Sequence, residues 1–185
     1  MVQQQLALET MESVVTRTHA AHKVYVDGSV QGNGSSACAI YCTTLSPIKG
    51  ADWTGRRLPD SSSSTLCELN GILDGITLLL HHRVNGLIVC DSQAALYALR
   101  TARPVCKRVV TEILHQLLRA VDASLTVSFV WIPSHVGLVG NERVDALAKA
   151  ACTQAVPVAV EITLMSLRRR ILWNGWSHGY PSEGR

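Results

Sequence analysis

Alternating apolar and polar residues near the start of the chain predict a β-hairpin. Val24 and Val26 alternate with Tyr25 and Asp27, and several glycines then precede a second apolar run at residues 37–41. Alternation with a period of two is the pattern of a strand that buries one face, and the glycines can supply the turn. We therefore expect two antiparallel strands joined by a glycine-rich connection.

A third strand is expected over residues 52–56, and a long amphipathic helix follows it. Serines at 61–64 can cap a helix N-terminus, and over residues 69–80 apolar side chains recur at the i, i+3, i+4, i+7 spacing of a helix face. Residues 87–90 then form a continuous apolar run that ends at Asp91. Such a run is typical of a strand buried on both faces in a parallel sheet.

The second half of the chain continues the alternation of helices and strands. The patterns predict helices over 94–99 and 110–121, a strand over 125–132, a loop over 133–140 and a final helix with its apolar positions in 144–151. This order of elements implies an α/β fold with right-handed crossovers. We expect a five-stranded mixed sheet, with three antiparallel strands followed by two parallel ones, flanked by helices.

One domain of ordinary size accounts for most of the chain. Of the 185 residues, 47% are apolar and 17% charged, which is the composition of a globular protein. Residues 1–22 show no clear period and are expected to lead into a domain that spans 23–154. Residues 155–185 form a tail with apolar positions at helical spacing, arginines and tryptophans. The tail is expected to be a short basic amphipathic helix or a linker, with a nucleic-acid or partner surface as the alternative.

Charge, cysteines and hydropathy limit where the protein is expected to work. The net charge of +3 is compatible with a nucleic-acid partner but does not require one. The six cysteines include no C-x-x-C pair and most lie among apolar neighbours, as buried thiols in a reducing compartment would. The N-terminus has no signal-peptide pattern, and no run reaches the ~18 apolar residues of a membrane span. We expect an intracellular protein of the cytoplasm, the nucleus or both, neither secreted nor bound to a membrane.

Four acidic residues occupy positions that a function would explain: Asp27, Glu68, Asp91 and Asp145. Each also has an ordinary structural explanation. Asp27 could stand at an exposed strand end, and Asp91 could cap the helix that follows it. Glu68 and Asp145 could be first-turn acids that interact favourably with a helix dipole. Taken one at a time, the four residues leave both explanations open.

The predicted topology brings the four acids together. If the strand of Asp27 lies beside the parallel strand that ends at Asp91, both carboxylates emerge at the sheet edge where α/β proteins bind ligands. Helices that begin near Glu68 and Asp145 would bring their first turns to the same edge. Four carboxylates at close range stay ionised near neutral pH only if a cation compensates them. Ligation by oxygen alone favours a hard ion such as Mg²⁺ over zinc.

Four sequence blocks around these acids resemble a known family. They read VYVDGS (24–29), STLCELNGI (64–72), IVCDSQAAL (88–96) and WIPSHVGLVGNERVDALAKAA (131–151). In order and spacing they are similar to the four blocks of type 1 ribonuclease H. The last block is most similar to the ribonuclease H domains of non-LTR retrotransposon polyproteins.

The resemblance implies a fold, an activity and a set of site residues. It implies an RNase H-like fold and an endonuclease that hydrolyses the RNA strand of RNA/DNA hybrids, leaving 5′-phosphate and 3′-hydroxyl ends. The catalytic carboxylates, which would bind two Mg²⁺ ions or Mn²⁺ in their place, would be Asp27, Glu68, Asp91 and Asp145. The two ions would lie roughly 3.5–4 Å apart with Asp27 as the shared ligand. His135 matches the family's mobile histidine, which assists proton transfer or product release.

The resemblance also implies contacts to the nucleic acid. Selectivity for RNA requires hydrogen bonds to 2′-hydroxyls. The candidate substrate-binding residues are Gly28, Ser29, Ser63, Ser64, Gln93 and Asn141. Ser63 or Ser64 would replace an asparagine that cellular members often carry, and Asn141 would cap the last helix and help to shape the site. A basic helix that some members insert is reduced here to residues 100–104, so we expect weak binding that depends on salt or on attached domains.

Two other functions remain open from the sequence. The chain could be a non-catalytic or conditionally active nucleic-acid-binding module of a retroelement polyprotein, although its complete set of four acids argues against lost catalysis. It could also be an integrase-like or transposase-like DNA nuclease, but those enzymes typically carry a glutamate on the last helix, where this chain has Asp145. A reverse transcriptase domain in the same polyprotein is a candidate partner.

Overall fold

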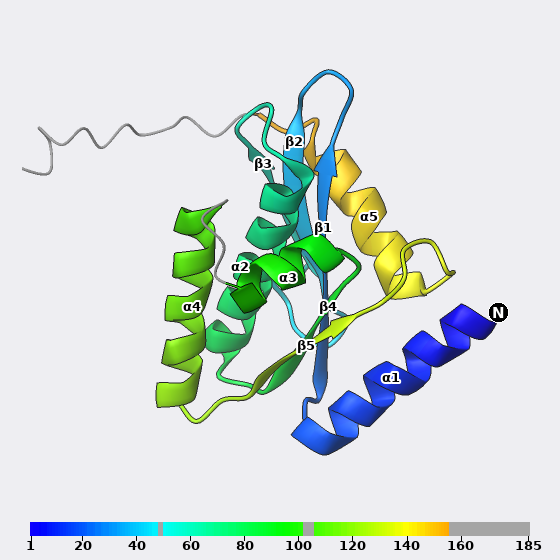
Figure 1. The fold of residues 1–185 in the computed structure, drawn as a ribbon, viewed down its shortest axis with the longest axis vertical. Helices are drawn as coiled ribbons and strands as arrows, with labels where there is room; N and C mark the ends of the chain where they lie inside the picture. The colour runs from blue at the N-terminus through cyan, green and yellow to red at the C-terminus, as the bar shows by residue number, and fades with distance from the viewer. Residues whose placement is uncertain (48–49, 102–105, 156–185) are drawn as a thin grey trace, which may run out of the picture.

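The computed structural model describes residues 1–47, 50–101 and 106–155 and has a five-stranded mixed sheet at its centre (Figure 1). The strand order is β3-β2-β1-β4-β5. The antiparallel strands are β1 (His22–Val30), β2 (Ser36–Tyr41) and β3 (Trp53–Leu58), and the parallel additions are β4 (Gly86–Cys90) and β5 (Val127–Trp131). The predicted α/β fold class with a five-stranded mixed sheet is confirmed.

The antiparallel half contains the predicted hairpin. β1 and β2 pair in a register that places Asp27 opposite Ala39. Gly34 lies in the turn between them with a φ of 86°, a conformation that glycine adopts without the clash a Cβ atom would cause. β3 continues to Leu58, two residues past its predicted end at Arg56, because Leu58 is still paired with β2 and buried.

α2 (Ser64–His82) is the crossover that leads from β3 to β4. Its N-cap is Ser63, whose hydroxyl accepts a hydrogen bond from the backbone amide of Leu66 at 3.2 Å, so the predicted serine cap is confirmed. The helix packs closely on β1, since a Cβ atom added to Gly71 would lie 3.2 Å from the carbonyl oxygen of Asp27. This packing places the first turns of α2 beside the half of β1 that carries Asp27.

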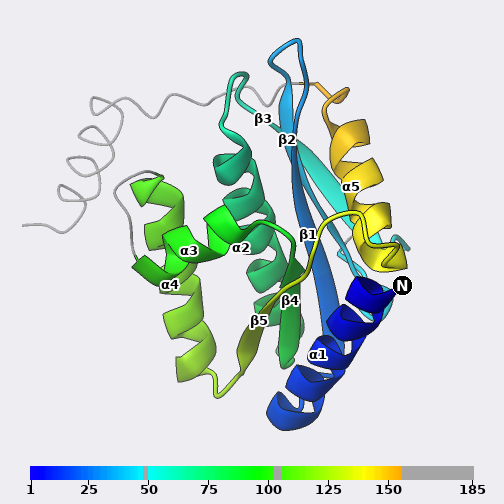
Figure 2. The same cartoon turned by 45° about the vertical axis from the view of Figure 1, so that its right-hand side comes forward.

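Helices cover both faces of the sheet (Figure 2). One face carries α2, α3 (Gln93–Thr101) and α4 (Lys107–Asp122), and the main core lies beneath them. The other face carries α5 (Val139–Ala151), which contacts β1, β2 and β3. The predicted helices of the second half are therefore present, and α5 begins before the predicted end of the loop at Gly140.

α1 (Val2–Thr18) is a helix that the sequence analysis did not predict. It lies on the same face as α5 and contacts β4 and β5. Its buried residues are Ala7 and Met11, so the helix carries little of the apolar periodicity by which an amphipathic helix is detected.

Two expectations concern residues outside the described part of the chain. These are the tail, from residue 156 onward, and positions 102–104 of the segment 100–104, which the resemblance to ribonuclease H sets in the place of a basic helix. In the residues that the structure does describe, no helix has the length and apolar character needed to cross a membrane.

Candidate active site

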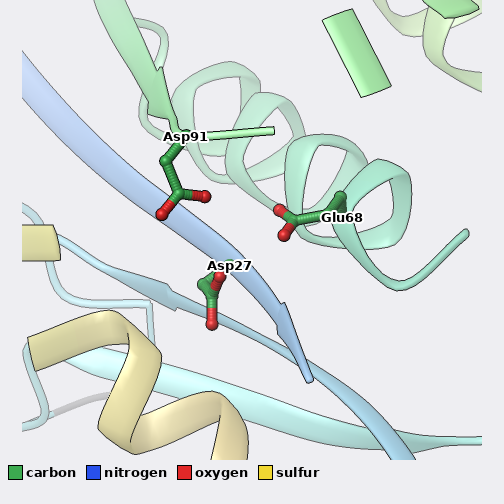
Figure 3. A group of neighbouring side chains, drawn as sticks. All are labelled: Asp27, Glu68 and Asp91. Carbon is green, nitrogen blue, oxygen red and sulfur yellow. The ribbon is translucent and has the colours of Figure 1, made fainter. Parts of the chain in front are cut away.

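Three of the four predicted carboxylates converge at one edge of the sheet (Figure 3). Asp27 lies in β1, Asp91 directly follows β4, and Glu68 projects from the second turn of α2. The three side chains point toward one another, and one carboxylate oxygen from each lies within 4.8 Å of the others. Carboxylates gathered in this way can share a hard divalent cation.

The ordinary explanations for these three residues do not hold in the structure. Asp27 is not at an exposed strand end, because it is 7% exposed. Glu68 is not in the first turn of its helix and is also 7% exposed. The residue that caps α3 is Ser92, whose hydroxyl accepts a hydrogen bond from the amide of Ala95 at 3.3 Å. The carboxylate of Asp91 therefore remains available for the site.

Gly28 allows Glu68 to reach the cluster. A Cβ atom at Gly28 would overlap the backbone nitrogen of Glu68 and the carbonyl carbon of Cys67. With no side chain at this position, α2 lies against β1 and presents Glu68 next to Asp27. Gly28 was predicted as a substrate contact, which stays a prediction, and the structure adds this packing role.

Burial and mutual repulsion raise the pKa values of the two buried acids. Desolvation, followed by the charges of Asp91 and Asp145, raises the pKa of Asp27 to about 7. Desolvation, followed by the charges of Asp27 and Asp91, raises the pKa of Glu68 to about 9. At neutral pH the metal-free cluster therefore retains a proton, since the carboxylates resist ionising together. A divalent cation would remove this repulsion, and a set of donors made of oxygen alone fits Mg²⁺ or Mn²⁺.

Asp145 lies beside the group of three and not within it. Its Oδ2 atom is 2.6 Å from Nζ of Lys149, one turn further along α5. Asp145 is also outside the first turn of α5, where Glu142 is the acidic residue. It is nevertheless near enough to raise the pKa of Asp27 by its charge. The structure thus brings three predicted acids together and holds the fourth next to them in an ion pair.

Asn141 does not cap the last helix, contrary to the prediction. α5 begins at Val139 after the N-cap residue Leu138, so Asn141 lies inside the first turn. Asn141 is 3% exposed, and its Nδ2 atom donates a hydrogen bond to Oδ2 of Asp91 at 3.0 Å. Its Oδ1 atom is buried without a hydrogen-bond partner in the described part of the chain. The amide therefore orients a carboxylate of the cluster.

The other predicted substrate contacts differ in their exposure to solvent. Ser63 and Ser64 are exposed at the start of α2, and Gln93 is exposed at the start of α3. Ser29 is buried, and its hydroxyl accepts a hydrogen bond from the side chain of Gln31. The roles of these residues toward a nucleic acid stay predictions.

His135 lies in the connection between β5 and α5, as expected from the sequence. Its side chain is 71% exposed, and its Nδ1 atom is 3.8 Å from a carboxylate oxygen of Glu142. The imidazole is therefore accessible to solvent, and its proposed catalytic role stays a prediction.

Besides the hydrogen bond of Asn141, three further contacts near the cluster were not predicted. They are the ion pair of Lys149, a hydrogen bond of 2.9 Å from Nε1 of Trp131 to the carbonyl oxygen of Asp91, and the thiol of Cys90 at 3.9 Å from Oε2 of Glu68. The i, i+4 spacing of Lys149 after its acidic partner could have indicated the first. The other two depend on contacts that bring distant parts of the chain together.

Comparisons with known proteins identify the family. The RNase H family matches residues 19–153, and no curated protein matches the chain. Among solved structures, RNase H1 from the halophilic archaeon Halobacterium salinarum is similar with a TM-score of 0.56 and 21% identity, over 72% of this chain and 98% of that chain. The N-terminal RNase H domain of a Mycobacterium tuberculosis protein, solved as a fusion with maltose binding protein, has a TM-score of 0.52 and 14% identity, over 71% and 94% of the two chains. Both structures support the fold, and the family match takes in every element from β1 to α5, so the chain belongs to the RNase H family.

Proposed function

We propose that this protein is a divalent-metal-dependent endonuclease that hydrolyses the RNA strand of RNA/DNA hybrids and leaves 5′-phosphate and 3′-hydroxyl ends. The observation that supports this most strongly is the buried group of Asp27, Glu68 and Asp91, whose oxygen atoms lie within 4.8 Å of one another. Membership of the RNase H family supports the type of reaction and the hybrid substrate.

The acidic residues would hold the metal. Asp27, Glu68 and Asp91 would hold two Mg²⁺ ions, and Mn²⁺ could take their place. Bound divalent cations lower the pKa of a water molecule and stabilise the leaving oxygen of a phosphodiester. Asp145 would become the fourth ligand by exchanging its ion pair with Lys149 for the cation.

Two polar residues would support these carboxylates. Asn141 would hold Asp91 in the orientation that its hydrogen bond gives in the structure. His135, which is exposed in the connection between β5 and α5, would transfer protons to and from solvent or assist product release. Hydrogen bonds to 2′-hydroxyls would come from the predicted contacts, which are Gly28, Ser29, Ser63, Ser64 and Gln93.

The biological setting is also a proposal. The similarity of residues 131–151 to non-LTR retrotransposon domains supports a role in removing template RNA, with a reverse transcriptase domain of the same polyprotein as partner. The six cysteines are unpaired thiols, which supports an intracellular location in the cytoplasm, the nucleus or both.

A cleavage assay with four substrates tests the activity. End-labelled RNA/DNA hybrid, RNA duplex, single-stranded RNA and DNA duplex are incubated at low salt with Mg²⁺, Mn²⁺ or EDTA. The native chain is compared with Asp27→Asn and with Asp52→Asn, a matched change at an exposed aspartate. We expect metal-dependent cutting of the RNA in the hybrid alone, lost in Asp27→Asn and kept in Asp52→Asn.

Two other outcomes would contradict the proposal. If the folded protein binds the hybrid but cuts nothing in either metal, it is the non-catalytic or conditionally active nucleic-acid-binding module of the first alternative. If it cuts DNA duplex, it is an integrase-like or transposase-like nuclease.

A further inference from the structure

α1 covers the part of the sheet that α5 leaves open, and it also covers both ends of the loop that carries His135. Met11 and Ala7 are 1% and 4% exposed on the inner face of α1. They belong to one apolar cluster with residues from β4, β5 and the two ends of the loop, namely Leu87, Val89, Val130, Ile132 and Leu138. Residues 132–138, called the histidine loop below, are therefore anchored at both ends beneath α1.

The first turn of α1 also contacts the middle of the histidine loop. Nε2 of Gln4 donates a hydrogen bond to the carbonyl oxygen of Gly137 at 2.8 Å. Residues 1–4 line a cavity of about 360 Å³ together with His135 and Val136. Figures 1 and 2 both show the start of α1 next to this loop. One hydrogen bond and an apolar cluster thus join an N-terminal helix to the loop of the predicted histidine.

The backbone of the histidine loop requires contacts that hold it in place. His135 has a φ of 54° and Gly137 a φ of 82°, both in the left-handed region. For a residue with a Cβ atom this conformation costs about 1–2 kcal/mol, so it must be stabilised by its surroundings. The imidazole itself contributes little burial, because it is 71% exposed. Gln4 supplies one of the contacts that stabilise this conformation.

We propose that α1 positions the histidine loop and that Gln4 is a positioning residue, which acts through the carbonyl group of Gly137 on the placement of His135. The proposal rests on the proposed function, because the placement of His135 affects turnover only if His135 takes part in it. α1 ends at Thr18, and the match to the RNase H family begins at residue 19. A helix outside the region matched by the family would therefore influence the rate of cleavage.

Hydrogen exchange tests the structural half of the proposal without any substrate. Gln4→Ala removes the side-chain donor to the carbonyl oxygen of Gly137. Gln5→Ala is the matched control, since the side-chain amide of Gln5 donates a hydrogen bond to the exposed Glu9 and not to the loop. We expect amides of residues 134–138 to exchange about threefold to tenfold faster in Gln4→Ala, as the loss of one hydrogen bond implies. Gln5→Ala should leave that exchange unchanged. Equal exchange in both variants would overturn the proposal.

A double-mutant cycle tests the functional half. We expect Gln4→Ala to lower kcat about twofold to tenfold with KM unchanged, and to have no further effect when His135→Ala is already present. A general structural defect would instead lower activity by the same factor in both backgrounds. That result, or an unchanged kcat in Gln4→Ala despite faster loop exchange, would overturn the proposal. If the native chain cleaves no hybrid, the proposed function fails, and the exchange experiment still decides whether α1 holds the loop.

Discussion

Asn141 shows how a single residue controls the cluster from outside it. The side-chain Nδ2 atom donates a hydrogen bond to Asp91, and the Oδ1 atom is buried without a partner in the described residues. The side chain of Asn141 is therefore committed to orienting Asp91. We expect Asn141→Ala to lower the affinity for Mn²⁺ or Mg²⁺ and the cleavage rate about 10-fold to 100-fold, as loss of a group that orients a metal ligand does. Titration of metal affinity and cleavage kinetics measure the two effects.

Glu68 lowers the stability of the metal-free protein at high pH. Its pKa rises from the ordinary value of 4.5 to about 9 on folding, so the folded state holds a proton that the unfolded state releases. Stability is unaffected at pH values below the unfolded pKa and falls as the pH rises from there to the folded pKa. We expect Glu68→Gln to stabilise the protein in EDTA by on the order of 1–3 kcal/mol at pH 9 and very little at pH 4, while abolishing cleavage.

Denaturant unfolding in EDTA at several pH values measures this effect. Glu9→Gln, at an exposed position of α1, is the matched control and should leave the pH dependence unchanged. A native chain whose stability rose between pH 5 and 9, or a Glu68→Gln variant less stable than the native chain at pH 9, would contradict the expectation.

At the scale of residues, the sequence was sufficient to predict the carboxylate cluster but not the contacts that hold its neighbours in place. Asp27, Glu68 and Asp91 could be grouped because the ends of neighbouring strands and of a packed helix must meet at one edge. The i, i+4 spacing of Asp145 and Lys149 permits their ion pair, but its formation depends on the rotamers of both side chains. The hydrogen bond of Asn141 depends on where α5 starts, which no local pattern determines.

At the scale of elements, the contact between β1 and α2 controls whether the site forms. Gly28→Ala would force α2 away from β1, because the new methyl group overlaps the helix backbone. We expect a loss of about 1–3 kcal/mol in stability and a fall in cleavage, although every carboxylate is still present. Unfolding curves and cleavage rates of the variant measure both effects.

Gly32→Ala is the control for that change. A Cβ atom at Gly32 would meet nothing within 4 Å, so stability should change by less than ~0.5 kcal/mol and activity should persist. Similar losses in the two variants would show that a general effect of the added methyl group, and not the approach of α2, explains the effect of Gly28→Ala.

The elements themselves could be predicted wherever their packing leaves a regular pattern. The buried run of β4 and the apolar face of α2 are visible in the sequence because nearly every core-facing position is apolar. α1 was missed because its fully buried positions are limited to Ala7 and Met11. α5 starts at Val139, earlier than predicted, and the residue before it, Leu138, is buried in the apolar cluster that includes Ala7 and Met11 of α1, a contact between distant parts of the chain.

At the scale of the whole molecule, metal binding and folding stability should be linked. A cation that binds the folded state alone stabilises it by about 2.7 kcal/mol at a concentration near 100 times its dissociation constant. We expect Mg²⁺ to raise the Tm by about 5–10 °C relative to EDTA at pH 8. The shift should be smaller at pH 5, because protons compete for carboxylates whose pKa values are raised.

Differential scanning calorimetry in Mg²⁺ and in EDTA, at matched ionic strength, measures this linkage. Asp27→Asn should show little or no shift at either pH. A shift that is equal at pH 5 and pH 8, or that persists in Asp27→Asn, would place the bound cation elsewhere on the molecule.

The position of β1 in the sheet has a consequence for the order of folding events. β1 pairs with β2, its neighbour in the chain, and also with β4, where Tyr25 lies opposite Val89. Local hairpins close in microseconds, whereas a parallel pair forms only after the intervening chain is ordered. Asp27 and Asp91 therefore meet only when α2 has docked and β4 has joined the sheet. During refolding, metal binding should therefore appear only when β4 joins the sheet, after the signals of hairpin and helix formation.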